Sequence, residues 1–98
     1  RFEDQNAIYT IPVRNLIYIT TDTLERKLII KTDYATIKVS KTLVEMEKLL
    51  PRQFKHSHRA CIVNVDRIRT IDKKNNEIIF DNGDKVDLLA KSFRKELV

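Results

Sequence analysis

Two histidines and one cysteine are the side chains of this sequence that are most suited to chemistry. His56 and His58 are one residue apart, so on a strand both would lie on one face, as the start of a metal site requires. The chain has no third histidine, and no nearby pattern of carboxylates completes a ligand set. Cys61 lies inside the apolar run 60–63, where burial raises the pKa of a thiol and makes it unreactive. We therefore expect no metal site and no nucleophilic cysteine.

Other catalytic arrangements find no support in the sequence. Gly83 is the only glycine, which excludes a glycine-rich phosphate-binding loop. Lysines and carboxylates occur singly, and a nuclease or other phosphoryl-transfer enzyme would need a metal-binding cluster of carboxylates that we do not find. We expect a protein with no catalytic residues and no cofactor.

Positive charge is concentrated in three stretches of the chain. Its 98 residues include 19 Lys and Arg against 14 Asp and Glu, for a formal net charge of +5, and acidic residues gather in 81–87. Clustered cations are typical of a protein that binds a polyanion, because each phosphate contact releases counterions. The alternative is a basic surface that only keeps the protein in solution. The stretches are 26–31 with Arg26, Lys27 and Lys31, 52–69 with Arg52, Lys55, Arg59, Arg67 and Arg69, and 91–95 with Lys91, Arg94 and Lys95.

The spacing of β-branched and apolar residues predicts a mainly β fold with one short embedded helix. Thr42 and Glu45 have the spacing of a capping box and Pro51 stops a helix, so we expect a helix over 42–50. Asn82-Gly83 predicts a tight hairpin turn, because such a turn needs positive φ angles. We expect strands at 8–11, 16–19, 27–32, 36–40, 61–63, 77–80 and 85–89, a loop at 20–23, a turn or short strand at 68–71, and a last helical turn at 91–97.

Length and composition predict one small cytoplasmic domain. Ninety-eight residues leave no room for two domains, and 42% hydrophobic against 34% charged residues is typical of a folded chain. A single cysteine excludes a disulfide framework and fits a reducing compartment. No apolar run approaches the roughly 20 residues of a membrane span, and no signal peptide opens the chain. We expect no membrane partner.

Residues 54–64, Phe-Lys-His-Ser-His-Arg-Ala-Cys-Ile-Val-Asn, resemble the central motif of the LytTR DNA-binding domain. In that family an aromatic residue is followed by a histidine, a basic or polar residue, a small residue, a bulky residue and then Ile/Leu-Val-Asn. Other segments resemble the family in the same order, from about Ile8 to Leu97: the strand 15–19, the helix 42–50 with 51–54 after it, the segment 65–68, the Asn-Gly hairpin and the basic end.

The resemblance implies a fold and a role. The fold would be an elongated arrangement of small, stacked β-sheets about a short helix, with residues 1–98 forming one output domain. The full protein would be a bacterial two-component response regulator whose N-terminal receiver domain, expected outside this chain, answers a sensor histidine kinase, often in peptide-pheromone quorum sensing. Such domains typically bind as dimers to direct repeats in double-stranded promoter DNA, and their loops enter successive major grooves.

The resemblance also places the contact residues in three loops. The loop before the third strand matches Glu25-Arg26-Lys27, the basic position of the central motif matches Arg59 with His58 beside it, and the C-terminal loop matches Ala90-Lys91-Ser92. His58 is equally suited to a structural role. The sequence departs from the family at Lys91, where an arginine pair is usual, at Ala60, usually serine, and at Cys61, usually aromatic. Together with the charge clusters, this predicts DNA contacts from Arg26, Lys27, Lys31, His58, Arg59, Lys91 and Ser92.

A second interpretation comes from another class of protein. A basic, β-rich module could instead dock an acidic protein partner, because both interactions are electrostatic. A footprint over two direct repeats of DNA would distinguish the two.

Overall fold

The computed structural model describes residues 1–97, and its strands form three antiparallel sheets there. A small N-terminal hairpin pairs β1 (Phe2–Glu3) with β2 (Ile8–Tyr9). The central sheet has the order β5 (Thr36–Val39), β4 (Lys27–Thr32), β3 (Leu16–Asp22), β7 (Cys61–Asn64), β6 (Phe54–His58). The third sheet has the order β10 (Lys85–Val86), β9 (Glu77–Phe80), β8 (Ile68–Asp72).

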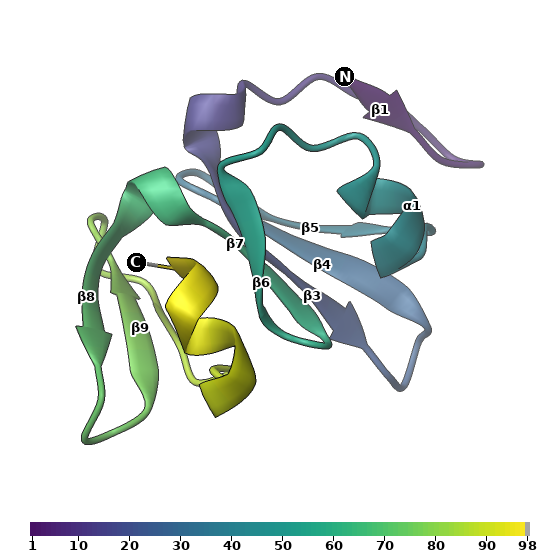
Figure 1. Cartoon of the computed structure of the whole chain (residues 1–98). Coiled ribbons are helices and arrows are strands. Elements are labelled where there is room, and N and C mark those ends of the chain that lie inside the picture. The colour runs from purple at the N-terminus through teal and green to yellow at the C-terminus, as the bar shows by residue number, and fades with distance from the viewer. Residues whose placement is uncertain (98) are drawn as a thin grey trace.

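Short helices connect and cover these sheets (Figure 1). The α-helix α1 (Leu43–Glu47) starts with the predicted capping box, in which Thr42 Oγ1 accepts from the Glu45 N–H at 3.1 Å and Glu45 Oε1 accepts from the Thr42 N–H at 3.0 Å. The molecule extends 40 × 25 × 22 Å. The expected elongated, mainly β fold with one short helix is therefore confirmed. The 3-10 helices are η1 (Val13–Asn15), η2 (Val65–Arg67) and η3 (Lys91–Leu97).

The strand β7 in the central sheet is buried on both faces, which explains why residues 61–63 are a continuous apolar run. In β7, Ile62 packs in the cluster shared with α1, while Cys61 and Val63 face the cluster shared with the third sheet and η3. A strand that alternates between two cores must be apolar at every position. Cys61 is fully buried, and desolvation raises the pKa of its thiol to about 11, as expected for an unreactive cysteine.

Several predicted boundaries are wrong at the ends of elements. The loop expected at 20–23 belongs largely to β3, because Thr20 and Thr21 pair with β4 and β-branched threonines fit a strand. The helix expected to reach residue 50 ends at Glu47, and the strands expected at 8–11 and 85–89 keep only two residues each. The strand β6 was not predicted.

Arg67 ties the central sheet to the third sheet. Its Nη2 donates to Asp33 Oδ1 at 2.8 Å and to Asp81 Oδ1 at 2.7 Å, and its Nη1 donates to the Arg14 carbonyl at 2.6 Å. Asp33 follows β4 and Asp81 follows β9, so one guanidinium joins both sheets. Hydrogen bonds from Arg67 lower the pKa of both carboxyl groups. Arg67 was predicted to be part of the basic stretch 52–69, but its charge is paired with Asp33 and Asp81 within the fold.

Replacing Arg67 with lysine should destabilise the fold. Lysine keeps the charge but cannot donate in a fork to two carboxylates and a carbonyl at once. We expect Arg67→Lys to lower the free energy of unfolding by about 1.5–3 kcal/mol in urea titrations. Arg69→Lys, at an exposed position two residues along, is the matched control and should change it by less than about 0.5 kcal/mol. Equal stability of the two variants would contradict the role given to Arg67.

Candidate nucleic-acid interface

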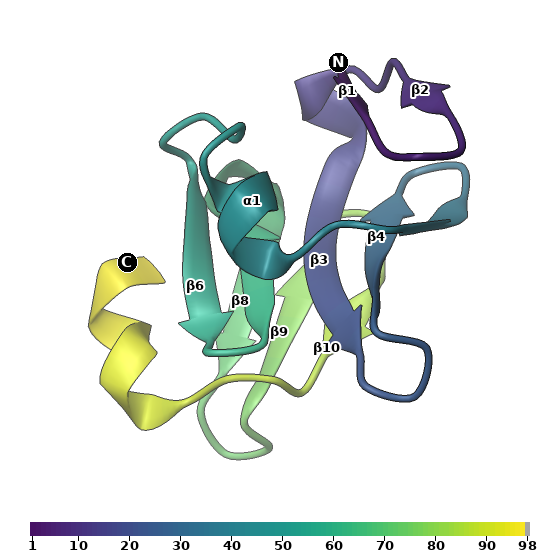
Figure 2. The same ribbon diagram turned by 90° about the vertical axis from the view of Figure 1, so that its right-hand side faces the viewer.

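Three loops that are distant in sequence meet along one edge of the molecule. The Thr21 N–H donates to the Ala60 carbonyl at 3.3 Å, which places the β3–β4 turn beside the β6–β7 turn. The Ala90 N–H donates to the Ser57 carbonyl at 2.8 Å, and Ser57 Oγ donates to the Leu88 carbonyl at 2.7 Å, which fixes the C-terminal loop against β6. Figures 1 and 2 show all three loops on the same lower side of the molecule. We call residues 22–26, 58–60 and 87–92 the loop edge.

The β3–β4 turn is held in one conformation by side chains. Asp22 Oδ1 accepts from the N–H groups of Leu24 at 3.0 Å and Glu25 at 3.4 Å. Lys38 Nζ, from β5, lies 3.2 Å from Glu25 Oε1 and 3.7 Å from Asp22 Oδ2, so it offsets both acidic groups of the turn. Arg26 has a φ of 56°, an uncommon angle for a side chain other than glycine, and is exposed. The turn therefore presents a cation on an ordered backbone.

The β6–β7 turn presents Arg59 at an exposed position. His58 stabilises this turn, since its Nδ1 accepts from the Ala60 N–H at 3.1 Å. A neutral His58 that accepts at Nδ1 carries its proton on Nε2, which leaves Nε2 as a donor. The structural role foreseen for His58 is thus present, and it is compatible with a contact to an anion. Arg59 lies at a chain reversal and not in an extended strand.

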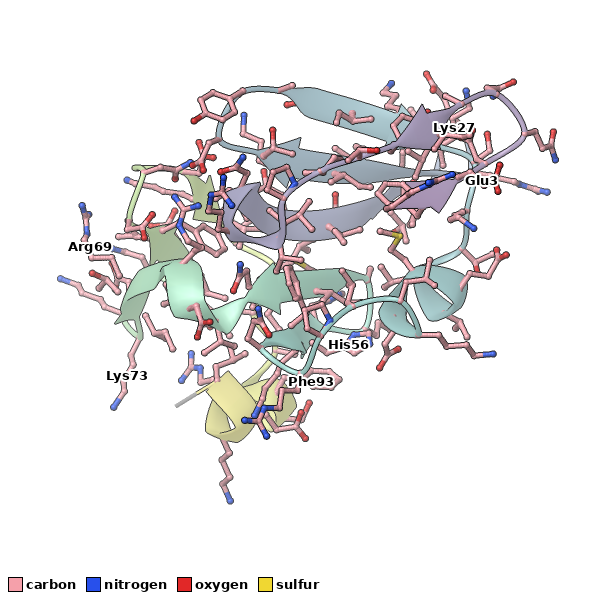
Figure 3. The ribbon with its side chains drawn as sticks, turned by 90° about the horizontal axis from the view of Figure 1, so that it is seen from above. Glu3, Lys27, His56, Arg69, Lys73 and Phe93 are labelled. Carbon is pink, nitrogen blue, oxygen red and sulfur yellow. The ribbon has the colours of Figure 1, made fainter. Side chains whose placement is uncertain are left out.

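The C-terminal loop leads into η3, whose first residues Lys91 and Ser92 are exposed. The helix is anchored through Phe93, which stacks on His56 with ring centroids 5.9 Å apart (Figure 3). His56 Nε2 in turn lies 3.1 Å from Glu47 Oε2 of α1. The His56 side chain therefore has a structural role. No cluster of three potential metal ligands occurs among residues 1–97.

The lysines of β4 differ in their relation to the loop edge. Lys27 begins β4 opposite Asp22, beside the turn. Lys31 lies four residues along the strand, about 13 Å away, and its Nζ is 3.5 Å from Thr36 Oγ1. The structure thus brings Lys27 to the edge with Arg26, Arg59 and Lys91 and separates Lys31 from them.

The basic stretch 52–69 is not one surface. Arg59 lies at the loop edge, Arg67 is held between the sheets, and Arg52 precedes the opposite end of β6. The β8–β9 turn, 73–76, was not among the basic stretches predicted from the sequence, and Figures 1 and 2 show it on the same side as the loop edge. This turn carries exposed Lys73 and Lys74 and is bound to the C-terminal loop, because Asn76 Nδ2 donates to the Leu89 carbonyl at 2.7 Å. The polar run Lys-Lys-Asn-Asn between two apolar segments was the available signal.

The link between His56 and Glu47 predicts a pH dependence of stability. Burial of the ring lowers the pKa of His56, but the hydrogen bonds to Glu47 and the His58 carbonyl and the charges of Glu47 and Glu96 outweigh this, so the pKa is raised above 6.5. A raised pKa in the folded state stabilises the fold fully below pH about 6.5 and no longer does so once the pH exceeds the folded pKa. The free energy of unfolding should therefore fall by up to about 1 kcal/mol as the pH rises from about 6.5 to above the folded pKa of His56.

Urea titrations between about pH 5.5 and 8.5 measure this dependence. Glu47→Gln should flatten it, whereas Glu3→Gln, at an exposed position away from His56 (Figure 3), should leave it unchanged. A Glu47→Gln variant with the parent's pH dependence would show that this pair does not couple the helix to β6.

Comparisons with known proteins agree with this architecture. The family model described as the LytTr DNA-binding domain matches residues 6–98. A solved structure of the LytTr DNA-binding domain of a putative methyl-accepting/DNA response regulator from Bacillus cereus is similar with a TM-score of 0.76 and 24% sequence identity, over 96% of this chain and 87% of that chain. No curated protein sequence matches. No helix within residues 1–97 has the length and apolar character needed to span a bilayer.

Proposed function

Because the chain belongs to the LytTr DNA-binding domain family, we propose that it binds double-stranded DNA sequence-specifically through the loop edge. The observation that carries this proposal is the meeting of three sequence-distant loops, each with an exposed cation: Arg26, Arg59 and Lys91. The α-helix α1 has five residues and packs its buried side chains on the central sheet, so it is too short to act as a recognition helix. Loops are therefore the elements that would enter the grooves.

The dimensions of the molecule support contacts over about one turn of duplex. Its long axis is 40 Å, and successive major grooves on one side of B-DNA are about 34 Å apart. The loops that would reach both grooves are braced by hydrogen bonds to the sheets, so little conformational entropy is lost on binding. A molecule of this length can thus meet two grooves and the backbone between them.

The side chains of the edge suit different contacts. Arg26 and Arg59 can each donate two hydrogen bonds to the O6 and N7 atoms of a guanine. Lys27, Lys91, Ser92 and the His58 Nε2–H suit phosphate oxygens. Lys31 would contact DNA only where the duplex passes along β4. The cations of the β8–β9 turn, Lys73 and Lys74, add to the positive potential on this side.

The wider role follows from the family. We infer that the domain is the output module of a bacterial response regulator in the cytoplasm, that a receiver domain elsewhere in the full protein answers a sensor histidine kinase, and that two copies bind direct repeats in a promoter. A response regulator is also what the name of the Bacillus cereus relative describes. We propose that this response regulator acts in quorum sensing.

Arg59→Ala tests the assignment of the loop edge. A duplex selected by this chain from a random pool, and a scrambled duplex, would be titrated by fluorescence anisotropy from about 50 to 200 mM salt. If Arg59 reads a base, the variant should lose about 1–3 kcal/mol on the selected duplex only. If it binds a phosphate, both duplexes should weaken and the salt slope should drop by about one.

The matched control is Arg14→Ala. Arg14 is also exposed, but it lies in η1, at the other end of β3 from the turn 23–26. The Arg14→Ala variant should bind both duplexes as the parent does. A folded Arg59→Ala variant that also binds like the parent would remove Arg59 from the interface. Failure to select any duplex over the scrambled pool would instead favour an acidic protein partner.

A further inference from the structure

Leu24 is the most exposed large apolar side chain of the described residues, with 94% of its surface accessible. It lies in the β3–β4 turn, between Asp22 and Arg26, and thus on the loop edge. Single exposed leucines are ordinary on protein surfaces and need no special explanation. Leu24 differs in its position, because it stands in water on the face where the proposed function places a DNA groove.

The turn holds the backbone of Leu24 in place before any partner arrives. Its N–H donates to Asp22 Oδ1 at 3.0 Å, and Lys38 Nζ holds the neighbouring Glu25 at 3.2 Å. The positive φ of Arg26 closes the turn. An apolar group on an ordered loop loses little entropy on binding, so its contact contributes more fully to affinity.

Leu24 is the only large, exposed apolar side chain of the β3–β4 turn among the described residues. The other exposed apolar side chains lie on other elements, namely the N-terminal hairpin, η1, the β4–β5 turn, α1 and the turn after it: Ile8, Val13, Tyr34, Val44 and Leu49.

We propose that Leu24 contacts the C5-methyl group of a thymine in the major groove, and so adds a thymine preference to the site. The thymine methyl is the one apolar group that a base pair displays in that groove, and it is matched by apolar side chains. Two residues of chain span at most about 7 Å, and base pairs are stacked about 3.4 Å apart. The thymine should therefore lie within about two base pairs of the guanine read by Arg26.

This inference rests on the proposed function, and replacing thymine with uracil tests it separately. Uracil lacks only the methyl group and keeps every hydrogen-bonding group of the base. In the duplex selected by this chain, each thymine would be replaced singly by uracil and the dissociation constant measured. One replacement should weaken binding of the parent about three- to fivefold, the effect of one buried methyl group.

The Leu24→Ala variant should bind the thymine and uracil duplexes equally, at about the weaker of the two parental affinities. Leu24→Met, which keeps an apolar reach, should retain a preference for thymine. Leu49→Ala, a matched substitution at an exposed site after α1, should keep the full parental preference. Circular dichroism confirms that the variants are folded.

The outcomes are distinguishable. If no duplex is preferred over a scrambled one, the proposed function fails and this inference with it. If a duplex is preferred but no thymine is sensitive to uracil, or if Leu24→Ala keeps the parental sensitivity, the role of Leu24 is wrong and the DNA-binding function stands. A Leu24→Ala variant that loses self-association in sedimentation while keeping the thymine preference would assign the side chain to a contact between copies instead.

Discussion

Arg67 and the ion pairs it forms set the orientation of the two larger sheets. The contact between these sheets is otherwise a cluster of Ile17, Val63, Ile78, Phe80 and other apolar side chains, and apolar contacts are not directional. The guanidinium adds direction, because a planar fork that binds Asp33, Asp81 and the Arg14 carbonyl fits only one arrangement. Each sheet carries part of the proposed binding side, so this orientation decides how those parts lie relative to one another.

The loops of the loop edge are likewise held to the sheets by polar contacts. Ser57 and Ala90 bind the C-terminal loop to β6, Asn76 binds it to the third sheet, and the β3–β4 turn is braced from β5 by Lys38. Cations that come from three separate loops can then act as one surface. In the proposed function, its positive potential would attract phosphates from any sequence, and the ordered turns would allow Arg26, Arg59 and Leu24 to distinguish bases.

Local patterns in the sequence were enough to predict several elements. The capping box at Thr42 and the turn at Gly83, whose φ is 94°, depend on neighbouring residues, and the apolar run at Cys61 reflects burial on both faces. The strand β6 was missed because Lys55, His56 and His58 give it a polar composition, although its partner β7 follows directly after a tight turn. The role of Arg67 was missed for a different reason, because its partners are 14 to 53 residues away in sequence. The placement of contact residues in these three loops was predicted only from the family resemblance.

The proposed function requires that DNA binds along the loop edge and not at the opposite end of the central sheet. Backbone amide chemical shifts, recorded by NMR during titration with the selected duplex, distinguish these two positions. We expect the largest changes at 22–26, 58–60 and 87–92, with little change in η1 and α1. Changes concentrated in η1, in α1 or around Arg52, with the loop edge unaffected, would show that DNA binds elsewhere.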